Sequence, residues 1–283
     1  MIRTVPIINN KGGVGKTTTT INLATGLARR DASVLIVDLD SQGSASLALG
    51  TDRDDLEPSV ASVMFGDCAV QDAVRTTSVS GLDLLTGSLR LADADTRLSS
   101  QDDRENRLSQ ALAPIEDAYD VILIDCAPST SLLSINALVA ADAFIIPVSP
   151  SYLSLEGVIS LGKVVNNVRR GIGEAAPVLG VLLTMVRRDD EQTRQIIDEV
   201  RNHYGGKVFD TEIRDDPAIE DAPGYGQSVF EHAPNSQGAA DYRNLVDEVI
   251  DRIDRYGSIF GQVRERTSQR KNTADDPSPN PSL

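Results

Sequence analysis

The sequence has little cysteine and no long hydrophobic run. Its 283 residues include only two cysteines, too few for a disulfide framework or for a metal cluster within one chain. No apolar stretch approaches the roughly 20 residues of a membrane-spanning helix. Lys11 and several glycines interrupt the first apolar run, which does not fit the layout of a signal peptide. We therefore expect a soluble, cytoplasmic protein that makes no contact with a membrane.

Lysine is also scarce, and acidic residues are in excess. There are 5 Lys beside 22 Arg and 30 Asp beside 12 Glu, and the formal net charge is −15. This bias is typical of proteins from a salt-rich cytoplasm, which indicates a halophile, although an ordinary acidic protein from a GC-rich genome can share it. In either case the field of the whole molecule repels polyanions, so binding to nucleic acid needs a local basic patch.

Short apolar runs alternate with helical patterns along the chain. Continuous runs rich in β-branched residues are typical of strands buried on both faces of a parallel sheet. Strands that alternate with helices predict an α/β fold, with a mostly parallel twisted sheet flanked by helices on both faces. The expected strands are 5–8, 34–37, 82–85, 121–124, 144–146 and 178–185, and the expected helices lie near 17–30, 103–117, 130–140, 153–170, 190–204 and 239–256.

One domain and a tail account for the whole length. Residues 1–256 carry the alternating pattern, and we expect them to form a single domain. The chain beyond Gly257 becomes polar, and Thr273 to Leu283 contain almost no apolar side chain. We therefore expect residues 257–283 to be a disordered C-terminal tail.

The most specific motif is a glycine-rich loop that follows the first strand and opens the first helix. That context is the one that a phosphate loop requires. Glycines allow successive N–H groups to turn toward phosphate oxygens, and the start of the helix adds unpaired donors. The loop predicts a nucleotide-binding segment made of Lys11, Gly12, Gly13, Val14, Gly15, Lys16, Thr17 and Thr18.

Within this loop, two side chains have chemistry suited to a triphosphate. Lys16 can supply a positive charge to the β and γ phosphates. The hydroxyl of Thr17 can bind Mg²⁺, which prefers oxygen ligands and bridges phosphates. Tight packing alone could also select a glycine-rich loop, but it would not explain these side chains at this position.

Carboxylates follow two of the predicted strands. Asp38 and Asp40 come at the end of the second strand, where alternation places them on the same side. Asp125 follows four apolar residues, which is the arrangement that delivers a carboxylate to Mg²⁺ at the carboxyl end of a buried strand. Asp38 and Asp40 could instead cap a helix or close a turn.

The spacing of the loop resembles that of the ParA/MinD family of P-loop ATPases, and within it the ParA/Soj partition ATPases. The ordinary motif has glycine at position 10, whereas this chain has Asn10 followed by a second lysine, Lys11. The resemblance implies a P-loop NTPase fold, and it implies that Lys11 reaches across a nucleotide-sandwich dimer to the phosphates of the partner chain. It also implies that Asp40 orients the attacking water, and Asp38 is expected to support the Mg²⁺ shell through water.

Two further regions follow from the resemblance, and this chain departs from the family in both. The family binds adenine through a Pro-x-Asn stretch, which here aligns with Arg214, Asp215 and Asp216, so we expect backbone groups near Arg214 and Asp216 to contact the base. The usual DNA-contacting arginines align with positions that are not basic. The candidate DNA contacts nearby are Arg187, Arg188, Arg194 and Arg214, which could equally be solvated helix faces.

These features predict a Mg²⁺-dependent ATPase with ATP and Mg²⁺ as cofactors. Lys11, Lys16 and Asp40 are the expected catalytic residues, and Thr17, Asp38 and Asp125 the expected metal site. The resemblance implies an ATP-dependent homodimer that binds DNA nonspecifically and, with a ParB-like partner, drives chromosome or plasmid partition on the nucleoid. Two alternatives stay open: a related ATPase that positions a protein assembly or organelle, and a nucleotide-locked scaffold with little turnover.

Overall fold

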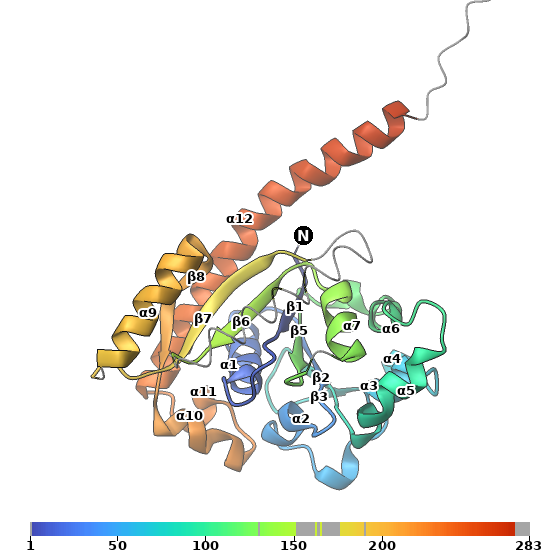
Figure 1. Cartoon of the computed structure of the whole chain (residues 1–283). Helices are drawn as coiled ribbons and strands as arrows, with labels where there is room; N and C mark the ends of the chain where they lie inside the picture. The colour runs from blue at the N-terminus through green and yellow to red at the C-terminus, as the bar shows by residue number, and fades with distance from the viewer. Residues whose placement is uncertain are drawn as a thin grey trace, which may run out of the picture.

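Eight strands form one sheet, in the order β3-β4-β2-β5-β1-β6-β7-β8 (Figure 1). The computed structural model describes residues 2–129, 131–150, 162, 165, 176–189 and 191–274, with side chains described as far as residue 255. The strands are β1 (Thr4–Ile7), β2 (Val34–Leu39), β3 (Val74–Thr76), β4 (Leu82–Leu85), β5 (Val121–Cys126), β6 (Phe144–Val148), β7 (Val178–Val186) and β8 (Val208–Arg214).

The sheet is parallel except at one edge, where β3 pairs antiparallel with β4. Every residue of β1, β2, β5 and β6 is buried, as the continuous apolar runs predicted. Successive side chains point to opposite faces, so Leu35 and Val37 join one hydrophobic core while Val34 and Ile36 join the other.

Helices cover both faces of the sheet. The core that contains Val34 and Ile36 also takes residues of α1, α2, α11 and α12, and the core that contains Leu35 and Val37 takes residues of α3, α5, α6, α7 and α9. The helices are α1 (Lys16–Ala28), α2 (Ser44–Ala48), α3 (Val60–Met64), α4 (Val70–Ala73), α5 (Ala94–Ser99), α6 (Arg107–Leu112), α7 (Leu132–Ala140), α9 (Glu191–Tyr204), α10 (Pro217–Asp221), α11 (Val229–His232) and α12 (Gln237–Ala274). Short 3₁₀ turns are η1 (Arg53–Asp55), η2 (Leu89–Asp93), η3 (Glu116–Ala118), η4 (Gly205–Lys207) and η5 (Ala222–Tyr225).

The α/β prediction and its mostly parallel sheet are confirmed, and all six predicted strands are present. The sequence did not reveal β3 or β8. β3 is short and partly exposed, and β8 carries polar residues at its exposed positions, so neither has a continuous apolar run. The helix expected near 103–117 is broken into α6 and η3. The helix expected near 153–170 lies outside the described residues, apart from 162 and 165.

The last helix is longer than predicted. We expected it to end at Tyr256, but α12 continues to Ala274 and leaves the body of the protein (Figure 1). The polar composition beyond Gly257 does not end the helix, because a glycine inside a helix costs only about 1 kcal/mol and the arginines, glutamate and glutamine that follow favour helix. The expected tail therefore loses residues 257–274 to the helix, and residues 275–283 lie outside the described part.

No helix among the described residues combines the length and the apolar character that crossing a bilayer would need. α12 is long enough, with 38 residues, but acidic and basic residues are spread along it.

Candidate functional site

The glycine-rich loop connects β1 to α1 and presents an uncapped helix start. Gly13 and Gly15 have φ angles of 70° and 79°, a left-handed conformation that glycine adopts without steric cost. Gly15 is the N-cap of α1, and it has no side chain to accept from the first N–H groups of the helix. An anion is the natural partner for those N–H groups.

Hydrogen bonds to the neighbouring strands β6 and β7 hold this loop in place. The hydroxyl of Thr184, at the end of β7, donates to the carbonyl of Val14 at 3.0 Å. The amide of Asn9 donates to the carbonyl of Pro147 at 2.8 Å, and its oxygen accepts from the N–H of Lys11 at 3.0 Å. Thr184 was not among the predicted site residues, because its contact with the loop spans 170 positions and carries no local motif.

Lys16 lies under the loop and is only 7% exposed. Its Nζ donates to the carbonyl of Lys11 at 3.0 Å, so the loop curls over the ammonium group. Burial lowers the pKa of Lys16, while the nearby carboxylate of Asp125 acts in the opposite direction. A cation in such a poorly solvated site interacts with an anionic ligand more strongly than it would in water.

Thr17 and Asp125 lie together, as the sequence predicted. The hydroxyl of Thr17 donates to a carboxylate oxygen of Asp125 at 2.7 Å, and the hydroxyl of Thr20 lies 3.4 Å from the other oxygen. Asp125 is fully buried at the end of β5. Burial raises the pKa of Asp125 well above its ordinary value, and the neighbouring Asp38 adds to the effect.

Asp38 lies beside Asp125, because the two residues pair in register across β2 and β5. Its oxygens accept from the N–H and the hydroxyl of Ser46, at 2.8 and 2.6 Å, and from the N–H of Asp40 at 3.2 Å. Burial raises the pKa of Asp38 to about 6. The bond to the Ser46 N–H caps the start of α2, so Asp38 has the capping role that we kept as its alternative.

Two adjacent buried carboxylates and a threonine hydroxyl fit a small divalent cation. A bound cation would relieve the repulsion between Asp38 and Asp125, and both groups offer the oxygen ligands that Mg²⁺ prefers. Among the described residues, no cluster of three or more His, Cys, Asp or Glu side chains forms a closed metal cage. This fits Mg²⁺, which uses one or two carboxylates and takes its remaining ligands from phosphates and water.

Asp40 is half-buried and currently closes a turn. One of its carboxylate oxygens accepts from the N–H of Gln42 at 3.0 Å. Its backbone carbonyl packs against Gly87, where an added Cβ would lie 2.6 Å from that oxygen and 2.8 Å from the Asp38 carboxyl carbon. Gly87 therefore allows the loops after β2 and β4 to meet, a role that only the tertiary structure reveals.

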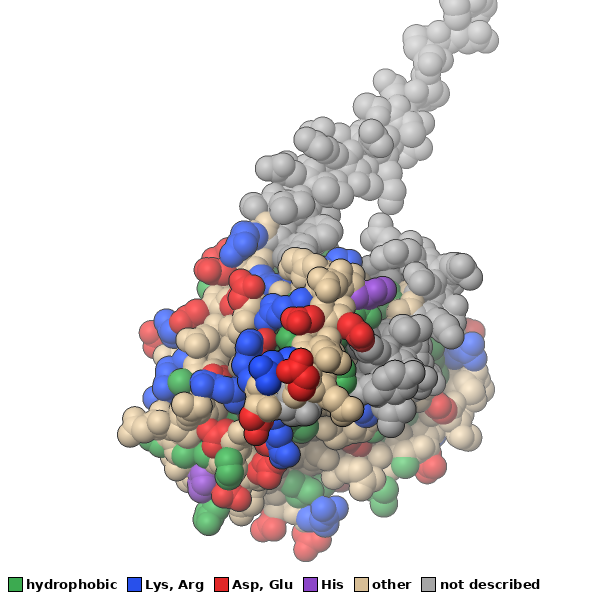
Figure 2. Space-filling view, turned by 60° about the vertical axis from the view of Figure 1, so that its left-hand side comes forward, with side chains coloured by type: hydrophobic (Ala, Val, Ile, Leu, Met, Phe, Trp, Pro, Cys, Tyr) green, Lys and Arg blue, Asp and Glu red, His purple; other side chains and the backbone are tan. Residues whose placement is uncertain are grey.

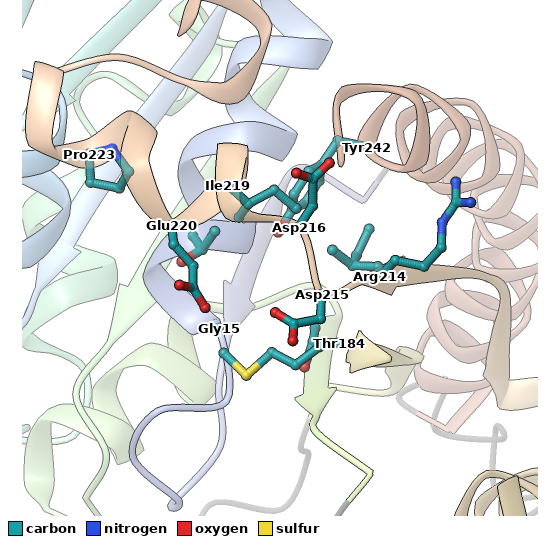
Figure 3. A pocket seen from close by; sticks show the side chains of 12 residues that line it. Gly15, Thr184, Arg214, Asp215, Asp216, Ile219, Glu220, Pro223 and Tyr242 are labelled. Carbon is teal, nitrogen blue, oxygen red and sulfur yellow. The ribbon is translucent and has the colours of Figure 1, made fainter. Parts of the chain in front are cut away.

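A pocket opens next to the loop, on the side of β7 and β8 (Figure 3). It is formed by the start of α1, the ends of β7 and β8, and parts of α10 and α12. Arg214 and Asp216, the predicted base contacts, both belong to its wall. Its lining residues are Gly15, Thr18, Thr184, Met185, Ile213, Arg214, Asp215, Asp216, Ile219, Glu220, Pro223 and Tyr242.

Contacts within the chain occupy the side chains of both predicted base contacts. The guanidinium and the backbone N–H of Arg214 donate to Asp241. The Asp216 carboxylate accepts from the N–H groups of Ala218 and Gly238, at 3.0 and 2.6 Å. These contacts thus hold the segment that forms the wall of the pocket.

The four arginines considered as DNA contacts all have acidic partners. Arg187 pairs with Asp215, and Arg214 with Asp241. Arg188 contacts Glu212 at 2.8 Å, and Arg194 contacts Glu191 at 3.3 Å. Figure 2 shows basic and acidic side chains interleaved among the described residues of one face of the protein. Arg187, Arg188 and Arg214 lie at or just beyond the ends of the neighbouring strands β7 and β8, and their acidic partners largely compensate their charges.

Together, these features define a class of protein. A glycine loop between β1 and α1, a buried lysine behind it, and an aspartate at the end of β5 form a phosphate-binding site at the carboxyl edge of a parallel sheet. This is the construction of a P-loop nucleotide hydrolase.

Comparison with known proteins identifies the family. A family model described as an AAA domain matches residues 2–175. The sporulation initiation inhibitor protein Soj of Bacillus subtilis is 39% identical over 249 residues, which cover 88% of this chain and 98% of Soj. The chromosome partitioning protein ParA of Caulobacter vibrioides is 36% identical over 253 residues, covering 89% of this chain and 95% of ParA. The chain belongs to the Soj/ParA family of P-loop ATPases.

Solved structures agree with this assignment. Cobyrinic acid a,c-diamide synthase from Mycobacterium smegmatis, with bound ADP and magnesium, superposes with a TM-score of 0.79 at 31% identity, covering 91% of this chain and 97% of that one. MinD of Pyrococcus horikoshii, complexed with Mg-ADP, has a TM-score of 0.73 at 27% identity, covering 88% and 96%. The predicted ATPase, its fold and its cofactors ATP and Mg²⁺ are confirmed at the level of the family.

Proposed function

We propose that this ATPase forms an ATP-sandwich dimer, binds DNA nonspecifically and, with a ParB-like activator, drives the partition of a chromosome or plasmid. The observation that carries this proposal is the position of Lys11 in a chain related to Soj over 88% of its length. Lys11 precedes Gly12 and Gly13, which are exposed at the outer side of the loop, whereas Lys16 is buried beneath it. In the proposed dimer, Lys16 serves its own site and Lys11 serves the site of the partner chain.

Each residue of the site has a distinct task in this proposal. The N–H groups from Gly13 to Thr18 and the Lys16 ammonium bind the phosphates. Thr17 and Asp125 hold Mg²⁺, with Asp38 behind them. When bound, Mg²⁺ neutralises charge on the β and γ phosphates.

Two residues then act on the γ-phosphate. Asp40 orients the attacking water, a task for which its carboxylate must exchange the Gln42 N–H for that water. Lys11 of the partner subunit stabilises charge that develops on the phosphoryl group. Hydrolysis removes the group that both lysines bind, so the dimer loosens and the ATPase changes state.

The test combines light scattering, phosphate release and a DNA gel shift, with and without ATP·Mg²⁺, at several KCl concentrations. We expect ATP-dependent dimers that bind DNA of any sequence, with affinity falling as salt rises. A protein that stays monomeric with ATP·Mg²⁺ would contradict the sandwich dimer.

The ion pairing of the candidate DNA-contacting arginines favours a second candidate, a related ATPase that positions a protein assembly. McdA of Cyanothece superposes with a TM-score of 0.80, but at 22% identity this likeness concerns the fold alone. An ATP-dependent dimer that binds no DNA at any salt concentration would support this candidate over partition.

A further inference from the structure

An ion pair between a buried carboxylate and a partly exposed guanidinium lies directly behind the pocket beside the phosphate loop. Asp241 of α12 is 4% exposed. Its carboxylate accepts from the backbone N–H of Arg214 at 3.0 Å, from Nε at 3.0 Å and from a terminal guanidinium nitrogen at 2.5 Å. One buried side chain therefore fixes both the main chain and the side chain of the last residue of β8.

A second contact joins the same two elements. Asp216 accepts from the N–H of Gly238, at the start of α12, at 2.6 Å. A Cβ at Gly238 would lie 2.5 Å from Cγ1 of Ile219, so α12 approaches α10 closely. The stretch from Arg214 to Ile219, which forms one wall of the pocket, is thus hydrogen-bonded to α12 at Arg214 and Asp216 and packs against it at Ile219.

The directions of the side chains show which residues line the pocket and which lie behind its wall. Figure 3 shows the Arg214 side chain running away from the pocket toward α12, while the carboxylates of Asp215 and Glu220 lie on the side of Gly15. The guanidinium of Arg214 is therefore part of the support behind the wall. Holding a wall in its bound geometry raises affinity, because the ligand then spends less free energy on ordering it.

We propose that Asp241 is a positioning residue for the nucleotide base. Its ion pair and hydrogen bonds with Arg214 hold the wall of the base pocket against α12. This inference rests on the proposed function, in which ATP binds at the phosphate loop, and on the expectation that its base lies in the neighbouring pocket, whose wall contains Arg214 and Asp216. Asp241 touches no substrate, and it acts on ATP affinity and not on the hydrolytic step.

A purely structural role makes a different prediction from a positioning role. Loss of a structural ion pair would weaken the phosphate site and the base site together, or would only lower the stability of the fold. Loss of a positioning residue would weaken the binding of a ligand that carries a base and spare one that lacks it. Inorganic tripolyphosphate is such a ligand, because it carries the phosphates alone.

The test compares Asp241→Asn with Asp247→Asn. Asp247 lies on the same helix and pairs with Arg30, but its side chain is 54% exposed, so this control loses a solvated ion pair. For Asp241→Asn we expect the KM for ATP to rise about tenfold, with kcat and the inhibition constant of tripolyphosphate within about twofold of the wild type. Asp247→Asn should change none of these values. Arg214→Lys keeps the charge but loses the two guanidinium hydrogen bonds to Asp241, so it should give the same pattern as Asp241→Asn. It replaces Asp241→Asn in the test if that variant does not fold.

A third variant, Glu220→Trp, separates failure of this inference from failure of the pocket assignment. It places a bulky ring in the pocket, so it should raise the KM for ATP if the base binds there. If Glu220→Trp raises KM while Asp241→Asn behaves like the control, Asp241 is not a positioning residue, although the pocket assignment stands. If neither changes KM, the base binds elsewhere and the assignment fails as well. An equal loss of ATP and tripolyphosphate binding in Asp241→Asn would assign it a structural role only.

Discussion

The two sides of the nucleotide site are built on different principles. The phosphate side, meaning the loop from Lys11 to Thr18 with Asp38, Asp40 and Asp125, uses the backbone N–H groups of one loop and carboxylates at or just beyond the ends of two buried strands, and each of these segments is a motif visible in the sequence. The proposed base side, meaning the ends of β7 and β8 with α10 and the start of α12, depends on pairs such as Arg214 with Asp241, which belong to no sequence motif. The phosphate side therefore constrains residue types, whereas the proposed base side constrains a surface that different residues can support.

The largest expected effect is on the phosphate side. Lys16→Ala should lower kcat/KM about 10²–10³-fold, because the site loses the buried cation that faces the phosphates. Lys207→Ala is the matched control: it removes a lysine in η4, remote in sequence from the loop, and should leave hydrolysis unchanged. Steady-state phosphate release measures both. Similar activity in the two variants would contradict the proposed role of Lys16 in binding the phosphates.

Asp40 sharpens the comparison, because its carboxylate has both a turn role and a proposed catalytic role. Asp40→Asn keeps an oxygen that can accept from the Gln42 N–H but removes the charge, whereas Asp40→Ala removes both. If Asp40 orients water, both variants should lower kcat about 10²-fold, and ATP affinity should change little. Single-turnover hydrolysis and equilibrium ATP binding measure the two quantities. A wild-type kcat in Asp40→Asn would mean that Asp40 only closes the turn with Gln42.

The smallest expected effect concerns the arginines of the base side. Arg188→Ala should weaken DNA binding less than about twofold, because Glu212 already compensates this charge. The converse change, Glu212→Gln, leaves Arg188 and Arg201 without this partner and should strengthen DNA binding and its dependence on salt. Gel shifts at several KCl concentrations measure the slope. A large loss of DNA binding in Arg188→Ala would mean that the ion pair with Glu212 does not prevent Arg188 from binding DNA.

The residues proposed for the phosphate side belong to motifs that can be recognised in the sequence alone. Glycines at positions of positive φ, a lysine after the last glycine and an aspartate at the end of an apolar run are visible without a structure. The contact between Thr17 and Asp125 followed from two strands meeting at one edge of a sheet.

The supports of this site were not predictable in the same way. Thr184 and Gly87 act through contacts with residues far along the chain, and single residues of these types carry no motif. The base side was predicted only by alignment with a family stretch that the chain does not keep. Asp241, which we propose as its support, lies in a helix whose pattern indicated nothing beyond packing against the sheet.

Lys11 tests the central claim, that this ATPase couples ATP to assembly by supplying a lysine to the neighbouring chain. The direct measurement is the mass in solution by light scattering, for the wild type and for Lys11→Ala, with saturating ATP·Mg²⁺ and with ATP affinity measured in parallel. We predict that the wild type doubles its 30.3 kDa mass while Lys11→Ala stays monomeric and still binds ATP. A Lys11→Ala protein that forms the same ATP-dependent dimer would contradict the account.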